Sequence, residues 1–165
     1  MIVRSERLED RAAIRLVNEQ AFGRPDEADL VEKLREEGVV IASFVCEAEG
    51  RIAGHILFSR IAIDTATDSI SAVALAPVAV IPELQRRGIG GELIRQGIAW
   101  LREHGEQIIL VLGHPEYYAR FGFSAAKASH IESPFTLASF MALELMPNTL
   151  QGLSVKVRYP AAFGL

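Results

Sequence analysis

Two arginines and three glycines gather in one short turn of this chain, between Gln85 and Gly91. Glycine lets a backbone turn sharply and approach a ligand closely, because it has no Cβ. The N–H groups at the start of a helix are free, and the helix dipole favours negative charge there. Arg86 and Arg87 add two permanent cations that can bind phosphate oxygens. Together these features predict a turn that binds a pyrophosphate.

An apolar strand precedes this turn and an amphipathic helix follows it. The strand is predicted from Ile70 to Ile81 and the helix from Gly88 to His104. One stripe of the helix carries Ile89, Leu93, Gly97, Trp100 and Leu101. This spacing predicts that the helix packs on a sheet with its N-terminus at the turn.

Two common phosphate-binding motifs do not fit the turn. The P-loop requires Lys-Ser or Lys-Thr, and neither dipeptide occurs in the sequence. The dinucleotide fingerprint requires a third glycine where this chain has Leu93, and the following strand, Ile108 to Leu112, is wholly apolar and lacks the ribose-binding acid. An alternative remains open, in which the glycines serve only helix–sheet packing.

Two motifs in this part of the chain resemble the GNAT superfamily of N-acetyltransferases. Gln85-x-x-Gly88-x-Gly90, preceded by the residues 78–82, resembles its acetyl-coenzyme A signature. The segment 117–123 resembles its Tyr-x-x-x-Gly-Phe element. The form Leu-Gly-x-Pro-x-Tyr-Tyr-x-Arg-Phe-Gly-Phe resembles a bacterial subgroup whose substrates are poorly assigned. It lacks the asparagine that commonly follows the strand.

The resemblance implies an acetyl-CoA-dependent N-acetyltransferase. Acetyl-CoA would be the cosubstrate, no metal is expected, and the acetyl group would move to a primary amine by direct attack in a ternary complex. The acceptor would be a small molecule or a protein amine. Two alternatives are another acyl-CoA acyltransferase and a non-catalytic CoA-binding regulatory domain.

The resemblance also assigns residues to the coenzyme. Backbone groups of Val78 and Val80 would bind the pantetheine amides, and an N–H near Val80 would polarise the thioester carbonyl. The expected coenzyme-binding residues are Val78, Ala79, Val80, Gln85, Arg86, Arg87, Gly88, Ile89, Gly90, Gly91, His114 and Tyr117.

Tyr118 lies four residues before Gly122, where the superfamily often places its general acid. A phenol has a pKa of about 10 and a thiol of about 8.5, so protonation of the leaving thiolate needs a well-placed hydroxyl in a site that excludes water. Tyr117 is the adjacent alternative, and aromatic packing is an alternative for both tyrosines.

No single residue is predicted to be the general base. Some members of the superfamily have a glutamate on the strand before the turn, where this chain has alanines at positions 72, 74 and 76. The candidates elsewhere are Glu47, His55, Glu83 and His114. His114 could also be a helix-cap residue or a contact to coenzyme A, and a water relay is a further alternative.

Asp10 is predicted to cap the first helix, and Pro25 to lie in the first turn of the second. A hairpin turn is predicted at Glu49 and Gly50, and the last strand from Leu153 to Tyr159.

The predicted element order is β-α-α-β-β-β-α-β-α-β-β, which is the order expected of the GNAT fold. The fold class is therefore α/β, with a mixed, central, twisted sheet and helices on both faces. Pro77 cannot donate a ladder hydrogen bond, so it predicts locally broken pairing, or a simple bulge. The resemblance implies that Ala74–Ile81 and Ile108–Leu112 splay apart there to admit pantetheine.

Composition limits the remaining classes. At 165 residues the chain is predicted to be a single domain, residues 1–165. It has no apolar run of about 18 residues and no signal-peptide pattern, which predicts a cytoplasmic protein without a membrane partner. The net charge of −4 argues against nucleic acid, and a homodimer stays open. The single cysteine, Cys46, is expected to be buried, and acceptor contacts are expected from Gln20–Pro25 and Ser129–Ala138.

Overall fold

The computed structural model describes residues 1–136, 138–150 and 155–165. The chain forms two compact units, each built from two segments. The first unit contains Met1–Ser59 and Ala76–Trp100, and the second contains Arg60–Leu75 and Leu101–Leu165. Three elements contribute to both units: β3 (Arg51–Asp64), β4 (Ser69–Val80) and α3 (Ile89–Glu103).

The first unit has strands in the order β1-β2-β3-β4. Strand β1 (Ile2–Ser5) pairs antiparallel with β2 (Val40–Ala48), and β2 pairs antiparallel with β3 through a hairpin. The predicted turn at Glu49 and Gly50 is confirmed, because both residues have positive φ. The helical elements of this unit, besides α3, are η1 (Leu8–Asp10), α1 (Arg11–Phe22), α2 (Asp26–Glu36) and η2 (Pro82–Leu84).

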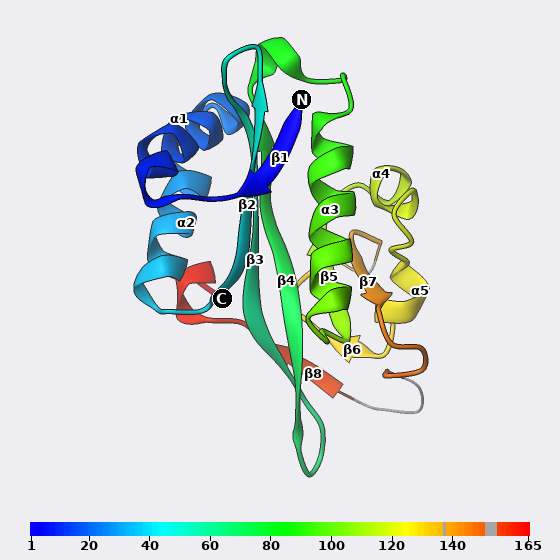
Figure 1. Cartoon of the computed structure of the whole chain (residues 1–165). Helices are drawn as coiled ribbons and strands as arrows, with labels where there is room; N and C mark the ends of the chain where they lie inside the picture. The colour runs from blue at the N-terminus through cyan, green and yellow to red at the C-terminus, as the bar shows by residue number, and fades with distance from the viewer. Residues whose placement is uncertain (137, 151–154) are drawn as a thin grey trace. The chain divides into compact units, whose positions relative to one another are not determined.

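Helices cover both faces of the strands in this unit, with α1 and α2 on one side and α3 on the other (Figure 1). Alternate residues of β3 explain the arrangement, because successive side chains of a strand point to opposite faces. His55 contacts Asn18 of α1, whereas Gly54 and Phe58 approach α3. The expected buried thiol is confirmed, since Cys46 is fully buried on β2 and burial raises the pKa of its thiol.

The second unit has strands in the order β3-β4-β5-β7. Strand β5 (Ile108–Leu112) is parallel to β4 and antiparallel to β7 (Phe140–Glu144), so the sheet is mixed. Its apolar core includes Ile63, Leu110 and Phe140. The other elements are α4 (Pro115–Ala119), α5 (Ala125–Ala128), β6 (Ile131–Glu132), β8 (Val155–Arg158) and η3 (Ala161–Phe163).

The ladder between β4 and β5 is short. It holds two residue pairs, Val73 with Ile109 and Ala74 with Leu110, and does not run along the whole of β5. Pro77 follows Ala74 by three positions and is preceded by a cis peptide bond. Short pairing agrees with the predicted interruption, while a gap that admits pantetheine stays a prediction.

Some local predictions were wrong. Asp10 was expected to cap α1, but its carboxylate accepts hydrogen bonds from the Arg7 N–H and the Arg4 guanidinium, because a 3₁₀ turn precedes the helix. Pro25 precedes α2 rather than opening it, and α5 and β6 were not predicted. The last strand was expected from Leu153 to Tyr159, and its first two residues lie outside the described residues. Among the described helices, none is long and apolar enough to cross a membrane.

Candidate functional site: the turn before α3 and the tyrosine of α4

The turn between β4 and α3 is tied to its neighbours at both ends. The Ile81 N–H donates to the Ala53 carbonyl at 2.9 Å, which fixes the exit of β4. The side-chain amide of Gln85 then donates to the Val80 carbonyl at 2.9 Å. Gln85 therefore folds the turn back on the end of β4, a role that sequence alone did not predict.

Left-handed backbone at two positions shapes the turn. Arg86 has φ +62° and Gly88 has φ +88°. For a residue with a Cβ this conformation costs about 1–2 kcal/mol, which explains the glycine at position 88. The first helical hydrogen bond runs from the Glu92 N–H to the Gly88 carbonyl at 3.0 Å. The N–H groups at the very start of α3 therefore have no acceptor within the helix.

The glycine of the turn and the glycines of the helix–sheet contact are different residues. A Cβ on Gly97 would lie 2.4 Å from two ring atoms of Phe58, and a Cβ on Gly54 would lie 2.8 Å from Ile89. Apart from Gly88 and its two neighbours in the chain, no atom of the described residues lies within 4 Å of the place where a Cβ on Gly88 would stand. Packing therefore explains Gly54 and Gly97, but it does not explain Gly88.

The charged side chains around the turn differ in their ion pairs. Arg87 lies 3.5 Å from Glu49, at the tip of the β2–β3 hairpin, and Arg51 lies 3.9 Å from Glu83. Arg86 is exposed and makes no ion pair with any residue that the structure describes. The exposed pairs are weak, so both Arg86 and Arg87 can turn toward an anion.

The other residues that the resemblance assigns to the coenzyme differ in their burial. Val78 and Val80 are half-buried near the end of β4, and Ala79 is buried. Ile89 is buried against the position of Gly54, so its side chain packs inside the unit. Only the backbone of Ile89 can face a ligand at the turn.

Tyr118, in the second unit, is 8% exposed and lies on α4. Its ring meets Tyr117 edge-on at 5.1 Å between centroids and Phe123 edge-on at 5.8 Å. Burial, with a smaller effect of Tyr117, raises the pKa of Tyr118 to about 12. The phenol is therefore protonated at neutral pH.

Tyr117 and His114 have different surroundings. Tyr117 is half-buried, lies 5.4 Å from the Phe121 ring, and has the Arg120 guanidinium over its face at 5.5 Å. His114 is exposed before α4, and its carbonyl, not its side chain, accepts from the N–H groups of Tyr117 and Tyr118. His114 is therefore the N-cap residue of α4, as one alternative expected, and it acts there through its backbone, because its side chain makes no capping hydrogen bond.

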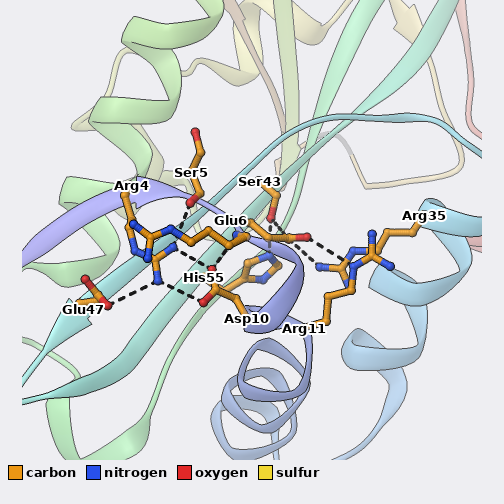
Figure 2. A network of polar contacts seen from close by, with 10 residues as sticks. Arg4, Ser5, Glu6, Asp10, Arg11, Arg35, Ser43, Glu47 and His55 are labelled. Atoms are coloured by element: carbon orange, nitrogen blue, oxygen red, sulfur yellow. Dashed lines mark hydrogen bonds and ion pairs between the residues drawn. The ribbon is translucent and has the colours of Figure 1, made fainter.

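Two of the base candidates have structural partners in the first unit (Figure 2). Glu47 lies 3.4 Å from Arg4, which also binds Asp10. His55 is completely buried, between Ser43 at 3.0 Å and Asn18 at 3.1 Å. The burial of His55 argues against a base that must reach a substrate, whereas the Glu47 side chain is 43% exposed.

The hydrogen bonds of His55 fix its tautomer. The Asn18 amide nitrogen donates to the Ile14 carbonyl. Because this NH₂ group has two donors and no acceptor, it also donates to His55 Nδ1. The proton is therefore on Nε2 and is donated to Ser43, whose hydroxyl donates to Glu6 at 2.5 Å. Burial lowers the pKa of His55 to about 3, with a contribution from Arg35, so the ring stays neutral.

The predicted acceptor segments have mixed surfaces. In Gln20–Pro25, Phe22 is 39% exposed and Arg24 is bonded to Glu27 at 2.6 Å. The other segment, Ser129–Ala138, contains position 137, which lies outside the described residues. Three of its residues, 132–134, line a cavity of about 600 Å³ in the second unit. Carboxylates and cations both line this cavity, so its charge selects no acceptor.

The sequence did not predict the close contact of Tyr118 with Gly113 in the second unit. A Cβ there would lie 2.4 Å from Cε2 of the Tyr118 ring. The available signal was a glycine directly after a buried strand, which often marks close approach of another group.

Residues 3–126 match the family described as an acetyltransferase (GNAT) domain. The chain is 47% identical over 116 residues to YjhQ, an uncharacterised N-acetyltransferase of Escherichia coli. That match covers 69% of this chain and spans 64% of YjhQ. This chain is also 30% identical to YhbS, another uncharacterised N-acetyltransferase of E. coli, over 166 residues that cover 99% of this chain and 98% of YhbS.

Two solved structures share the fold over nearly the whole chain. E. coli YhbS in complex with CoA is 30% identical and matches with a TM-score of 0.88, over 99% of this chain and 92% of that one. A GNAT family acetyltransferase of Brucella melitensis in complex with acetyl-CoA is 36% identical and matches with a TM-score of 0.80, over 98% of this chain and 97% of that one. The predicted fold class is confirmed by these matches.

Proposed function

Because this chain belongs to the GNAT family of acetyltransferases, we propose that it moves the acetyl group of acetyl-CoA to a primary amine by direct attack in a ternary complex. The observation that carries the proposal is the turn before α3. Arg86 and Gly88 are left-handed there, the first N–H groups of α3 have no acceptor within the helix, and two exposed arginines precede them in the chain. CoA and acetyl-CoA in the two related structures support the choice of ligand.

The turn would hold the pyrophosphate of acetyl-CoA. N–H groups from Gly88 to Gly91 would donate to its oxygens, with Arg86 and Arg87 as clamps from the side. Gln85 would act indirectly, because its amide is engaged by the Val80 carbonyl. Backbone groups of Val78 and Val80 would bind the pantetheine amides and polarise the thioester.

Tyr118 would protonate the leaving thiolate. The amine nitrogen attacks the thioester carbonyl, the C–S bond breaks, and the thiolate takes the phenol proton while the amine proton leaves to a base or water. A pKa of about 12 keeps the phenol protonated at neutral pH. Burial that disfavours the phenolate would also disfavour the thiolate, so the pKa of the Tyr118 phenol and the pKa of the CoA thiol would both rise.

Amine assays test the function. The purified chain is mixed with acetyl-CoA and a panel of small amines, lysine peptides and peptides with free N-termini, and release of free thiol is followed. Release that requires one class of amine is expected. Release only with a longer acyl-CoA would favour another acyltransferase, and binding of acetyl-CoA without release from any amine would favour a regulatory CoA-binding domain.

Tyr118→Phe tests the general acid, since it keeps the ring and removes only the hydroxyl. Turnover should fall by about 10²–10⁴-fold while CoA affinity stays nearly unchanged. Because the pKa of Tyr118 is about 12, the loss should be the same factor at every pH from about 7 to 10. Tyr117→Phe is the matched control and should cost much less. Near-normal turnover of Tyr118→Phe would assign the tyrosine to packing.

A further inference from the structure

Gly113 connects β5 to α4, and its backbone does not require glycine. Its φ is not positive, unlike that of Gly88 or Gly122. Its N–H donates to the Ser139 carbonyl at 3.0 Å, as any residue but proline could do. The reason for glycine must therefore lie in what surrounds the missing Cβ.

The Tyr118 ring occupies the space that a Cβ on Gly113 would need. That Cβ would lie 2.4 Å from Cε2, 3.0 Å from Cδ2 and 3.5 Å from Cζ of the ring. Since ordinary contact begins at 3.4 Å, a methyl group there would have to move the ring by about 1 Å.

The ring has little freedom to move elsewhere. Phe123, which is 3% exposed, meets it edge-on at 80°, and Tyr117 meets it edge-on at 89°. The backbone of Tyr118 is held as well, because its N–H donates to His114 at 3.1 Å and its carbonyl accepts from Phe121 at 3.0 Å. The Tyr118 ring is thus in contact with the backbone of Gly113 and with the rings of Tyr117 and Phe123.

We propose that Gly113 is a positioning residue, which sets where the Tyr118 hydroxyl is presented to the reacting sulfur. The proposal rests on the proposed general-acid role of Tyr118. A catalytic group that is misplaced by about 1 Å can lose about 10²-fold in rate. Gly113→Ala should therefore lower kcat by about 10²-fold, and by no more than Tyr118→Phe does.

A double-mutant cycle separates positioning from a general structural effect. The variants are Gly113→Ala, Tyr118→Phe and the two together, compared for kcat, for CoA affinity and for the midpoint of thermal unfolding. If Gly113 acts through the hydroxyl, Gly113→Ala should change kcat less than about 3-fold when Phe already stands at position 118. The same loss in both backgrounds would overturn the proposal, and so would a Gly113→Ala protein with the parent's kcat.

Gly105→Ala is the control for destabilisation in the same unit. Gly105 has φ +79° and nothing within 4 Å, so alanine there strains the backbone without touching Tyr118, and kcat should stay at the parent's value. If Gly113→Ala does not fold, Phe123→Leu replaces it, because it loosens the contact of the Tyr118 ring with Phe123. It should lower kcat several-fold with Tyr118 and have no effect with Phe at position 118; equal effects would overturn the proposal.

The cycle also keeps the two proposals apart. If Tyr118→Phe retains the parent's kcat, the general-acid role fails and the positioning role fails with it. If Tyr118→Phe loses activity and Gly113→Ala does not, only the positioning role of Gly113 is refuted.

Discussion

Alanine at position 88 should weaken coenzyme binding without unfolding the protein. Gly88 has φ +88°, and a Cβ there would meet no atom within 4 Å. The substitution therefore introduces no clash, and its cost is the conformational one, about 1–2 kcal/mol for a residue with a Cβ. If the turn relaxes to avoid this cost, the N–H groups at the start of α3 change direction, and CoA affinity should fall by about 5- to 30-fold.

Calorimetric titration with CoA measures the affinity, and thermal unfolding measures the stability. Gly105→Ala is the matched control, because Gly105 also has positive φ and open space but lies past the far end of α3. Both variants should lose a similar amount of stability, whereas only Gly88→Ala should bind CoA more weakly. Gly88→Val should show a larger loss of affinity than Gly88→Ala, since a branched side chain also obstructs the ligand.

One result would refute the assignment of this turn to the pyrophosphate. If Gly88→Ala and Gly105→Ala are destabilised alike and both bind CoA as the parent does, the turn before α3 does not hold the pyrophosphate.

Three further predictions concern stability. Burial lowers the pKa of His55 to about 3, so between about pH 6.5 and pH 3 the unfolded chain takes up a proton that the folded chain excludes. The free energy of unfolding should therefore decrease as the pH is lowered through this window, by on the order of 1 kcal/mol per pH unit from this group. His55→Gln should flatten this slope, and His130→Gln should not. Gly97→Ala should destabilise the protein by about 1–3 kcal/mol through overpacking against Phe58. Adding Phe58→Leu to this variant should recover part of the lost stability. If Gly97→Ala is as stable as the parent, the close contact between Gly97 and Phe58 is contradicted. The chain should unfold in one calorimetric transition, as a single domain over residues 1–165, and two separate transitions would refute that prediction.

The sequence predicted the region around the turn well, because local signals there agree with one another. An apolar run, a glycine-rich turn and a helical stripe place β4 and α3 within one or two residues of their observed bounds. The family resemblance is confirmed by the family match to residues 3–126. Left-handed backbone at Arg86 could not be predicted, because arginine carries no signal for positive φ.

Long-range contacts explain what the sequence could not predict. Asp10 reads as a helix cap from its neighbours, but Arg4 from β1 binds its carboxylate at 2.8 Å. His55 is a candidate base by residue type, and only the packing of Asn18 and Ser43 shows that it is buried and neutral. Gly113 falls in a short motif, but its contact with Tyr118 depends on how α4 turns back on β5.

Amide chemical shifts during a titration with CoA test the central claim most directly, because they report on the N–H groups themselves. In ¹⁵N-labelled protein, the amide signals of Gly88, Gly90 and Gly91 should move as CoA binds, while those of Gly105 and Gly164 stay in place. Replacing CoA with pantetheine, which has no pyrophosphate, should leave the first three signals nearly unmoved. If CoA saturates the protein and the signals of Gly88, Gly90 and Gly91 do not shift, the pyrophosphate is bound elsewhere and the proposed site is wrong.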